Sequence, residues 1–196
     1  LLGTNVTAAG GEFRVRTDPD GASPPAWTTD TGWIDPGINA TYAALWYFAN
    51  EPLVARWVEL SLRDASLSYV EAGRAVIMRS WSPVRSHDIG FSFGWIDPSL
   101  KHRSLGGQVW VDERARTRTL TVQLSSLTRE ELNNYLRALA QENGFTRDIL
   151  LALDPNSLDP GRDTYYGLLR EVPVYRNAFV GKADGYQFQF TLEERL

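Results

Sequence analysis

The chain of 196 residues contains no cysteine and only two histidines. Without cysteine, disulfide bonds, thiolate nucleophiles and zinc–thiolate sites are excluded. The histidines, His87 and His102, have neither HxxxH nor HExxH spacing, so the sequence predicts no metal site. There is no GxxxxGK[ST] loop and no GxGxxG turn either, and we therefore expect no cofactor.

Long apolar runs are also missing. No stretch approaches the roughly 20 residues that a helix needs to cross a bilayer, so we expect no membrane insertion. The first residues, LLGTNVTAAGG, lack the basic and apolar regions of a signal peptide. The net charge of −4 argues against a protein that clamps nucleic acid through its phosphates. The densest basic run, Arg114–Arg118, is interpreted as a solvated turn between strands.

What the chain does contain is a series of short segments with the alternation typical of β-strands. In RTLTVQLSS, Leu120, Val122 and Leu124 face one way and the polar residues between them face the other. Many short strands at regular spacing predict a mainly β fold, either a β-sandwich or a β-barrel. The other predicted strands are GEFRVR, VARWVELSLRD, SLSYV, RAVIMRSW, DIGFSFGW, QVWV, ILLAL, TYYGLLREVPVY and YQFQFTLEERL.

One α-helix is predicted beside the strands, at about Arg129–Asn143. Thr128 and Glu131 form a capping box at its start, and Gly144 stands where a left-handed C-terminal residue is needed. The apolar residues of the helix form a single stripe: Leu132, Tyr135, Leu136 and Leu139. A helix with one such stripe buries it, and the sheet is the available partner.

Composition suggests two parts. Residues 1–52 are rich in Gly, Ala, Thr, Asp and Pro and are predicted to be a loop-rich arm with one short strand, GEFRVR. Residues 53–196 are predicted to be the β domain with its helix. The arm either leans on a neighbouring chain or is a floppy terminus. The segment TYAALWYF within it is either a short helix or a buried strand.

The sequence GWIDP occurs twice, at Gly32–Pro36 and at Gly94–Pro98. Asp-Pro opens a compact turn, so both copies are interpreted as strand-ending turns. Trp33 and Trp95 either stack on sugar rings or are buried anchors of the strand ends, and the second interpretation is favoured.

Reactive groups in a catalytic arrangement are not found, so the sequence predicts that the protein is not an enzyme. GFSFG matches GxSxG, but Phe91 and Phe93 flank Ser92 in strand-like alternation, and no suitably placed histidine follows. The pairs Asp112-Glu113 and Glu193-Glu194 are sequence neighbours, which point to opposite faces of a strand, and both pairs are interpreted as solvated acids. A hydrolase, the third hypothesis, would depend on Asp88, Ser92, Asp112 or Glu113.

The second half of the chain, roughly Gly106–Arg195, resembles structural proteins of long-tailed bacteriophages. The resemblance runs through GGQVWV, RARTRTLTVQL, TREELNNYLRALAQENGF, ILLALDP, YYGLL and FQFTLEER. It is similar to the minor tail, distal tail and baseplate proteins, which share a tail-tube-like β-barrel flanked by a helix.

This resemblance implies a structural component of the virion tail without catalysis, made in the cytoplasm of the bacterial host. The implied partners are other tail proteins, namely the tube, the tip or hub and the fibres, and further copies in a hexameric or trimeric ring. No sequence-specific nucleic acid is implied, at most DNA passing through a lumen. The alternative is a carbohydrate-binding β-sandwich module for host-surface glycans, with Trp33, Trp81 and Trp95 as the candidate glycan or partner contacts.

Overall fold

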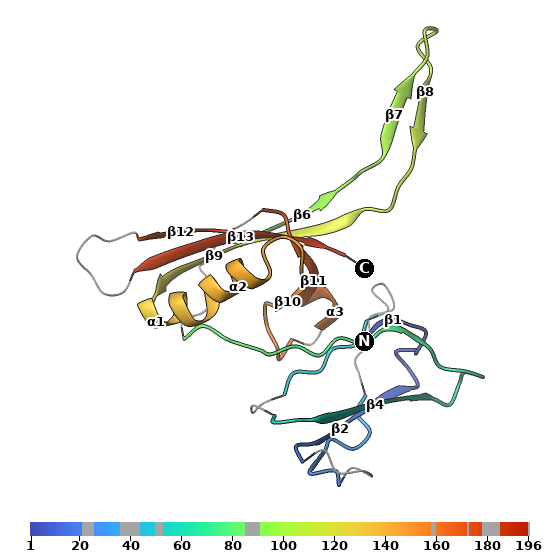
Figure 1. Cartoon of the computed structure of the whole chain (residues 1–196). Helices are drawn as coiled ribbons and strands as arrows, with labels where there is room; N and C mark the ends of the chain where they lie inside the picture. The colour runs from blue at the N-terminus through green and yellow to red at the C-terminus, as the bar shows by residue number, and fades with distance from the viewer. Residues whose placement is uncertain are drawn as a thin grey trace. The chain divides into compact units, whose positions relative to one another are not determined.

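The computed structural model describes residues 1–20, 26–35, 44–49, 53–84, 91–157, 160–171, 173–177 and 185–195 (Figure 1). Strands make up 44% of the structure and one helix has 14 residues, which confirms the predicted mainly β class with a single long helix. The chain divides into two compact units. Unit 1 comprises Leu1–Ile77 and Ala152–Thr164, and unit 2 comprises Met78–Leu151 and Tyr165–Arg195.

This division differs from a boundary after residue 52. The strand of the expected arm, β2 (Gly11–Asp18), pairs residue by residue with β4 (Trp57–Asp64), from Gly11 opposite Asp64 to Asp18 opposite Trp57. The expected arm therefore supplies the central strand of a sheet.

Unit 1 is built on the three-stranded sheet β3-β2-β4, in which β3 is Thr29–Asp30. The alternation of GEFRVR decides its faces: Phe13 and Val15 are buried, together with Val6 and Leu45 from outside the sheet. The apolar residues of β4 are partly buried and pack against this cluster: Val58, Leu60 and Leu62. Both predicted strands are confirmed.

A second, two-stranded sheet joins β1 (Leu2–Thr4) to β5 (Ala72–Arg74). The strand predictions for SLSYV and RAVIMRSW are wrong, apart from Arg74. RAVIMRSW has a continuous apolar stretch rather than alternation, and its Ile77 remains 67% exposed. In TYAALWYF, the described residues form neither helix nor strand, although Ala44 makes an isolated bridge to Leu2 and is buried.

Unit 2 contains a six-stranded sheet, in the order β10-β11-β13-β9-β6, with β12 paired to β13. Its strands are β6 (Ser92–Ile96), β9 (Thr117–Leu127), β10 (Ile149–Ala152), β11 (Thr164–Leu169), β12 (Val174–Asn177) and β13 (Tyr186–Glu194). In the described residues the path is open between β10 and β6, so the predicted barrel is not formed. A four-residue turn of helix, α3 (Pro160–Asp163), precedes β11.

The core of unit 2 follows the predicted alternation. Leu120 and Val122 on β9 and Phe188 and Leu192 on β13 are almost completely buried. They share a face because Val122 lies opposite Phe190, and Leu120 opposite Leu192, in the antiparallel ladder. The long helix lies along this sheet in Figure 1 and contributes Leu132 and Leu136 to the buried residues.

The helix begins and ends as predicted. It runs through α1 (Arg129–Glu131), η1 (Leu132–Leu136) and α2 (Arg137–Glu142). The capping box between Thr128 and Glu131 is present, and Gly144 has the expected positive φ of 52°. In η1, the backbone N–H of Arg137 donates to the carbonyl of Leu132, which makes a wider π-type turn in mid-helix.

A hairpin of two strands, β7 (Leu100–Arg103) and β8 (Val109–Asp112), extends beyond the sheet of unit 2 (Figure 1). It pairs with no other strand among the described residues. All eight of its strand residues are exposed, including Trp110 at 58%. The strand predicted in QVWV is thus confirmed, but its apolar side chains do not enter the core.

Candidate functional site

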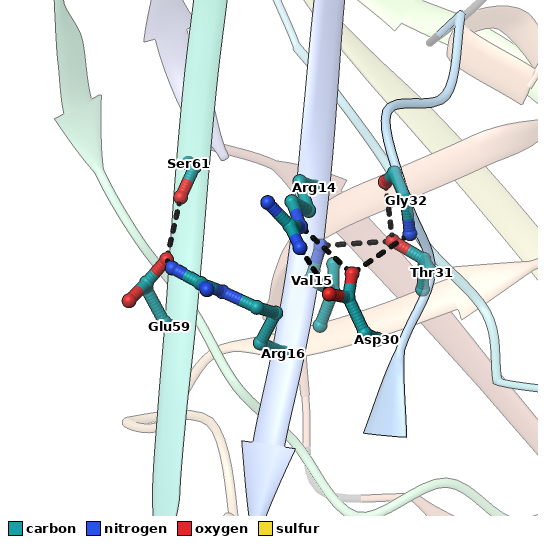
Figure 2. Close-up of polar contacts among 8 residues, drawn as sticks. All are labelled: Arg14, Val15, Arg16, Asp30, Thr31, Gly32, Glu59 and Ser61. Carbon is teal, nitrogen blue, oxygen red and sulfur yellow. Dashed lines mark hydrogen bonds and ion pairs between the residues drawn. The ribbon is translucent and has the colours of Figure 1, made fainter. Parts of the chain in front are cut away.

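The outer face of the sheet in unit 1 is densely charged. Because Phe13 and Val15 point into the core, the alternate residues of β2 point outward beside those of β3 and β4. We call this surface the charged face; Figure 2 shows most of it. Its members are Glu12, Arg14, Arg16, Asp30, Glu59, Ser61 and Arg63.

Each carboxylate of the charged face is matched by an arginine from another strand. Arg14 donates from Nε to Asp30 Oδ1 at 2.7 Å and from its guanidinium to Oδ2 as well (Figure 2). Arg16 donates from Nε to Glu59 Oε1 at 2.9 Å. These contacts are cross-strand and form a ladder of ion pairs on a rigid sheet.

The pKa values follow this pairing. The hydrogen bond from Arg14, supported by the backbone N–H of Gly32, lowers the pKa of Asp30 to about 2. The hydrogen bond from Arg16, and a second from Ser61, lower the pKa of Glu59. The Asp30 carboxylate in turn raises the pKa of Arg14. These groups stay ionised and matched near neutral pH, which suits binding and not proton transfer.

Two tryptophans flank the charged face. The guanidinium carbon of Arg63 lies 4.2 Å from the centroid of a Trp33 ring, and that of Arg16 lies 4.9 Å from Trp27. Trp33 is 36% exposed, so the favoured interpretation of a buried anchor is wrong for it. The sequence gives no sign of the contact at Trp27, because the segment around it shows no periodicity that would associate it with Arg16.

Trp95 lies at the end of β6 and is 60% exposed, so it is not a buried anchor either. With Asp97 and Arg116 it lines an open pocket of about 380 Å³. Arg116 Nε donates to Asp97 Oδ2 at 3.1 Å, and the Ser99 N–H donates to Asp97 Oδ1 at 3.0 Å. Hydrogen bonds from Ser99 are the main cause that lowers the pKa of Asp97. Strand β6 ends at Ile96, as predicted for this GWIDP copy, but residues 97–99 do not form the predicted turn, and the chain continues into β7.

Trp81 is half-buried and stacks on Tyr135 of the helix, with ring centroids 5.2 Å apart and planes 18° apart. Trp33 belongs to unit 1, whereas Trp81 and Trp95 belong to unit 2. No ring contact in the described part of unit 2 joins Trp81 to Trp95.

Among the described residues considered for hydrolysis, no hydrogen bond or ion pair joins Ser92, Asp112 and Glu113 to one another. Ser92 lies on the exposed strand β6, as its flanking phenylalanines predict, and Asp88 and His87 fall outside the described residues. Asp112 accepts from Arg114 at 3.1 Å on the exposed hairpin. Among the described residues, no group of three or more His, Asp or Glu side chains could hold a metal ion.

Two of the predicted solvated charges are buried instead. Arg118 and Glu194 form an ion pair in which Arg118 Nε donates to Glu194 Oε2 at 2.7 Å, and both side chains are about 95% buried. The Arg118 guanidinium also lies 4.5 Å from the centroid of the Tyr165 ring. The partners are 76 positions apart, so no local pattern indicates the pair.

The strands β6, β7 and β8 expose large apolar side chains on both faces of the hairpin and on β6, and we call this set the apolar ribbon. Phe93 lies opposite the completely buried Leu120 in the ladder and so on the same face, yet Phe93 is itself exposed. The face of the sheet that is buried at β9 is therefore exposed to solvent at β6. The ribbon consists of Phe93, Trp95, Leu100, Val109, Trp110 and Val111.

None of the helices in the described residues combines the length and the apolar character that a membrane span requires. Comparison with protein-family models, with curated proteins and with solved structures gives no match for this chain.

Proposed function

We propose that this protein is a structural component of a phage tail, in a distal tail or baseplate ring or as a minor tail protein, that connects the tail tube to the tip through symmetric protein–protein contacts. The observation that carries the proposal is the apolar ribbon, and in particular the hairpin β7–β8. The resemblance of Gly106–Arg195 to tail proteins supports the same assignment.

A hairpin of two strands is at best marginally stable alone in water. Here both strands are solvent-exposed on both faces, and they carry Leu100, Val109, Trp110 and Val111. Burial of such side chains contributes roughly 1.5–3 kcal/mol each. An element of this kind gains its order when a partner covers it, as in an assembly of many copies.

The first test is assembly. The mass of the purified protein, measured by light scattering and native mass spectrometry, should be a multiple of the 22.0 kDa chain, and electron microscopy should show rings. Val111→Ser on the hairpin should shift the protein toward monomer. Val84→Ser, which changes an even more exposed valine of unit 2 outside the hairpin, is the control and should leave the mass unchanged.

The second test is location. Mass spectrometry of purified phage particles should detect the protein in stoichiometric amounts with other tail proteins. Its absence from intact particles would exclude the virion role, whatever its mass in solution.

A second function, binding of host-surface glycans, is favoured by the pocket at Trp95. An exposed indole can stack on a sugar ring, while Asp97 and Arg116 offer an acceptor and donors for hydroxyl groups. Trp95→Ala should abolish a fluorescence change on adding host polysaccharide, whereas Trp110→Ala, an exposed tryptophan outside the pocket, should not. No response by the unmodified protein would remove this function.

A further inference from the structure

The two faces of the β7–β8 hairpin differ in charge. In its register, Lys101 lies opposite Val111 and Arg103 opposite Val109, so these four residues share one face, which we call the basic face. The other face carries Leu100, His102, Trp110 and Asp112. The basic face therefore presents two valines and two cations to whatever covers it.

The two cations of the basic face differ from the other cations near the hairpin in their pairing. In the described residues, Lys101 and Arg103 form no ion pair, whereas Arg114 and Arg116 beyond the strands pair with Asp112 and Asp97. Burying an unpaired charge is costly, so a surface that covers the valines must also bring acidic groups to the cations.

The chain itself contains an acidic unit. By sequence, unit 1 has twelve acidic and six basic residues, a net charge of −6, whereas unit 2 has twelve acidic and fourteen basic residues, a net charge of +2. Oppositely charged surfaces attract and orient each other on encounter. A second copy of this chain thus supplies what the basic face lacks.

We infer that the basic face of the hairpin docks on unit 1 of a second copy of this chain, in a head-to-tail contact. This inference rests on the proposed assembly and names its partner surface. A contact between two different surfaces repeats from copy to copy and closes into a ring when the rotation allows it. Nucleic acid is the other acidic partner, but the exposed apolar residues of the hairpin favour a protein surface.

The lysine content makes the contact directly testable. The chain has two lysines, Lys101 and Lys182, so few amines can react with a carbodiimide that joins an amine to a carboxylate in direct contact. Cross-linking of the full-length protein, mixed from unlabelled and ¹⁵N-labelled copies, should give peptides that join Lys101 to Asp or Glu of unit 1. Mixed-isotope peptides identify links between different copies.

Two conservative variants control the chemistry. Lys101→Arg keeps the charge and removes the amine, so the cross-link should disappear while the oligomer persists. Lys182→Arg should leave the Lys101 cross-link in place. Loss of the oligomer in Lys101→Arg, which keeps the positive charge, would contradict the role given to that charge.

Charge reversal tests the face. Lys101→Glu with Arg103→Glu should weaken association by about tenfold or more, because two attractions become repulsions, and raised salt should weaken the unmodified assembly. His102→Glu adds a negative charge on the opposite face of the same hairpin and should have a much smaller effect. Equal effects of both variants would overturn the assignment of the basic face.

The remaining outcomes also decide the inference. Lys101 cross-links found only within one copy, or only to carboxylates of unit 2, would overturn it. So would salt-sensitive retention of DNA oligonucleotides that the double charge reversal abolishes while the protein's mass stays unchanged. Detection in phage particles is independent of these results, so the virion role can fail or stand separately from the head-to-tail contact.

Discussion

At the residue scale, Ser126 holds a left-handed conformation, with a φ of 59°. It lies at an irregularity of the β9–β13 ladder, where Leu124 pairs with Phe188 but Leu127 pairs with Tyr186. The additional residue on β9 is a β-bulge, and it turns Leu127 into the core, where strict alternation would point it outward. A non-glycine residue in this conformation costs about 1 kcal/mol.

Ser126→Gly should therefore raise the free energy of unfolding by about 0.5–1 kcal/mol, measured by urea denaturation. Gln123→Gly, in a regular and exposed position of the same strand, is the matched control and should lower it by about as much. A destabilised Ser126→Gly protein would contradict the assignment of strain to this residue.

The buried pair of Arg118 and Glu194 gives a second prediction. Arg118→Met should lower the free energy of unfolding by about 3–5 kcal/mol, because it leaves the Glu194 carboxylate buried without its partner. Arg118→Met combined with Glu194→Leu should recover most of this loss, since two apolar groups then replace the two charges. Thermal unfolding of the three proteins measures both effects. Equal stability of the single and the double variant would contradict them.

These two sites show where local sequence reasoning ends. Leu120, Val122 and Leu124 were placed in the core correctly, because alternation is a local property of one strand. The burial of Leu127 depends on a bulge, and that of Arg118 depends on a partner 76 positions away. Neither can be recognised from the residues next to them in the sequence.

At the element scale, Glu131 connects the helix to a separate segment of unit 2. Its carboxylate accepts from the Thr128 N–H at 2.9 Å in the capping box, and also from the Val84 N–H at 2.9 Å. The Thr128 hydroxyl accepts from the Glu131 N–H at 3.1 Å and donates to the Glu131 carboxylate at 2.9 Å, both within the capping box. Glu131 therefore adds a contact outside the helix to its role in the capping box.

Thr128→Ala should cost about 1 kcal/mol of stability, the usual value for loss of an N-cap. Glu131→Ala should cost more, because it also leaves the Val84 N–H without its acceptor. Hydrogen exchange should show faster exchange at Val84 in Glu131→Ala but not in Thr128→Ala. Equal exchange in both variants would contradict the link.

The charged face predicts the pH dependence of unit 1. The pKa of Asp30 falls from 3.8 to about 2 on folding, so its contribution to stability is complete above about pH 4 and is lost as the pH falls through 2. Asp30→Asn should be less stable than the unmodified protein at pH 6, and the difference should vanish toward pH 2. Asp20→Asn, outside the ion-pair ladder, is the control. A difference that persists at pH 2 would argue against the ion pair as its source.

Elements with strong local signals were predicted well. The capping box, the apolar stripe and the C-terminal glycine of the helix all lie in one short segment, so its limits could be predicted. The hairpin strand in QVWV was also predicted correctly. RAVIMRSW was misjudged because an apolar run fixes neither a strand nor a partner. The charged face could be predicted only in part: alternation places Arg14 and Arg16 outside the core, but their acidic partners come from other strands.

At the scale of the whole molecule, composition gave the wrong impression of the first 52 residues. Segments rich in Gly and Pro precede and follow β2 in the sequence, but β2 pairs with residues of β4 that lie 39 (Asp18–Trp57) to 53 (Gly11–Asp64) positions away, and this pairing decides the unit to which it belongs. The open order of the large sheet was equally inaccessible, because barrels and open sheets share the same alternation within each strand.

The largest consequence of this architecture is that the hairpin should be dispensable for folding and necessary for assembly. Ile96 and Thr117 still pair at the end of the β6–β9 ladder, and Asp97 and Arg116 just beyond them form an ion pair. Replacing residues 98–115 by Asn-Gly, the preferred two-residue turn, joins β6 and β9 directly at this point.

The shortened protein should keep the thermal stability of the parent monomer, because none of the removed residues is buried. It should not form oligomers at any concentration at which the full-length chain does, measured by light scattering. Leu105→Ser, at the tip of the hairpin between the two strands, leaves both strands intact and should assemble. If the shortened protein still forms oligomers, the hairpin is not the assembly element. If it fails to fold, the hairpin contributes to the core, against the exposure of all eight of its strand residues.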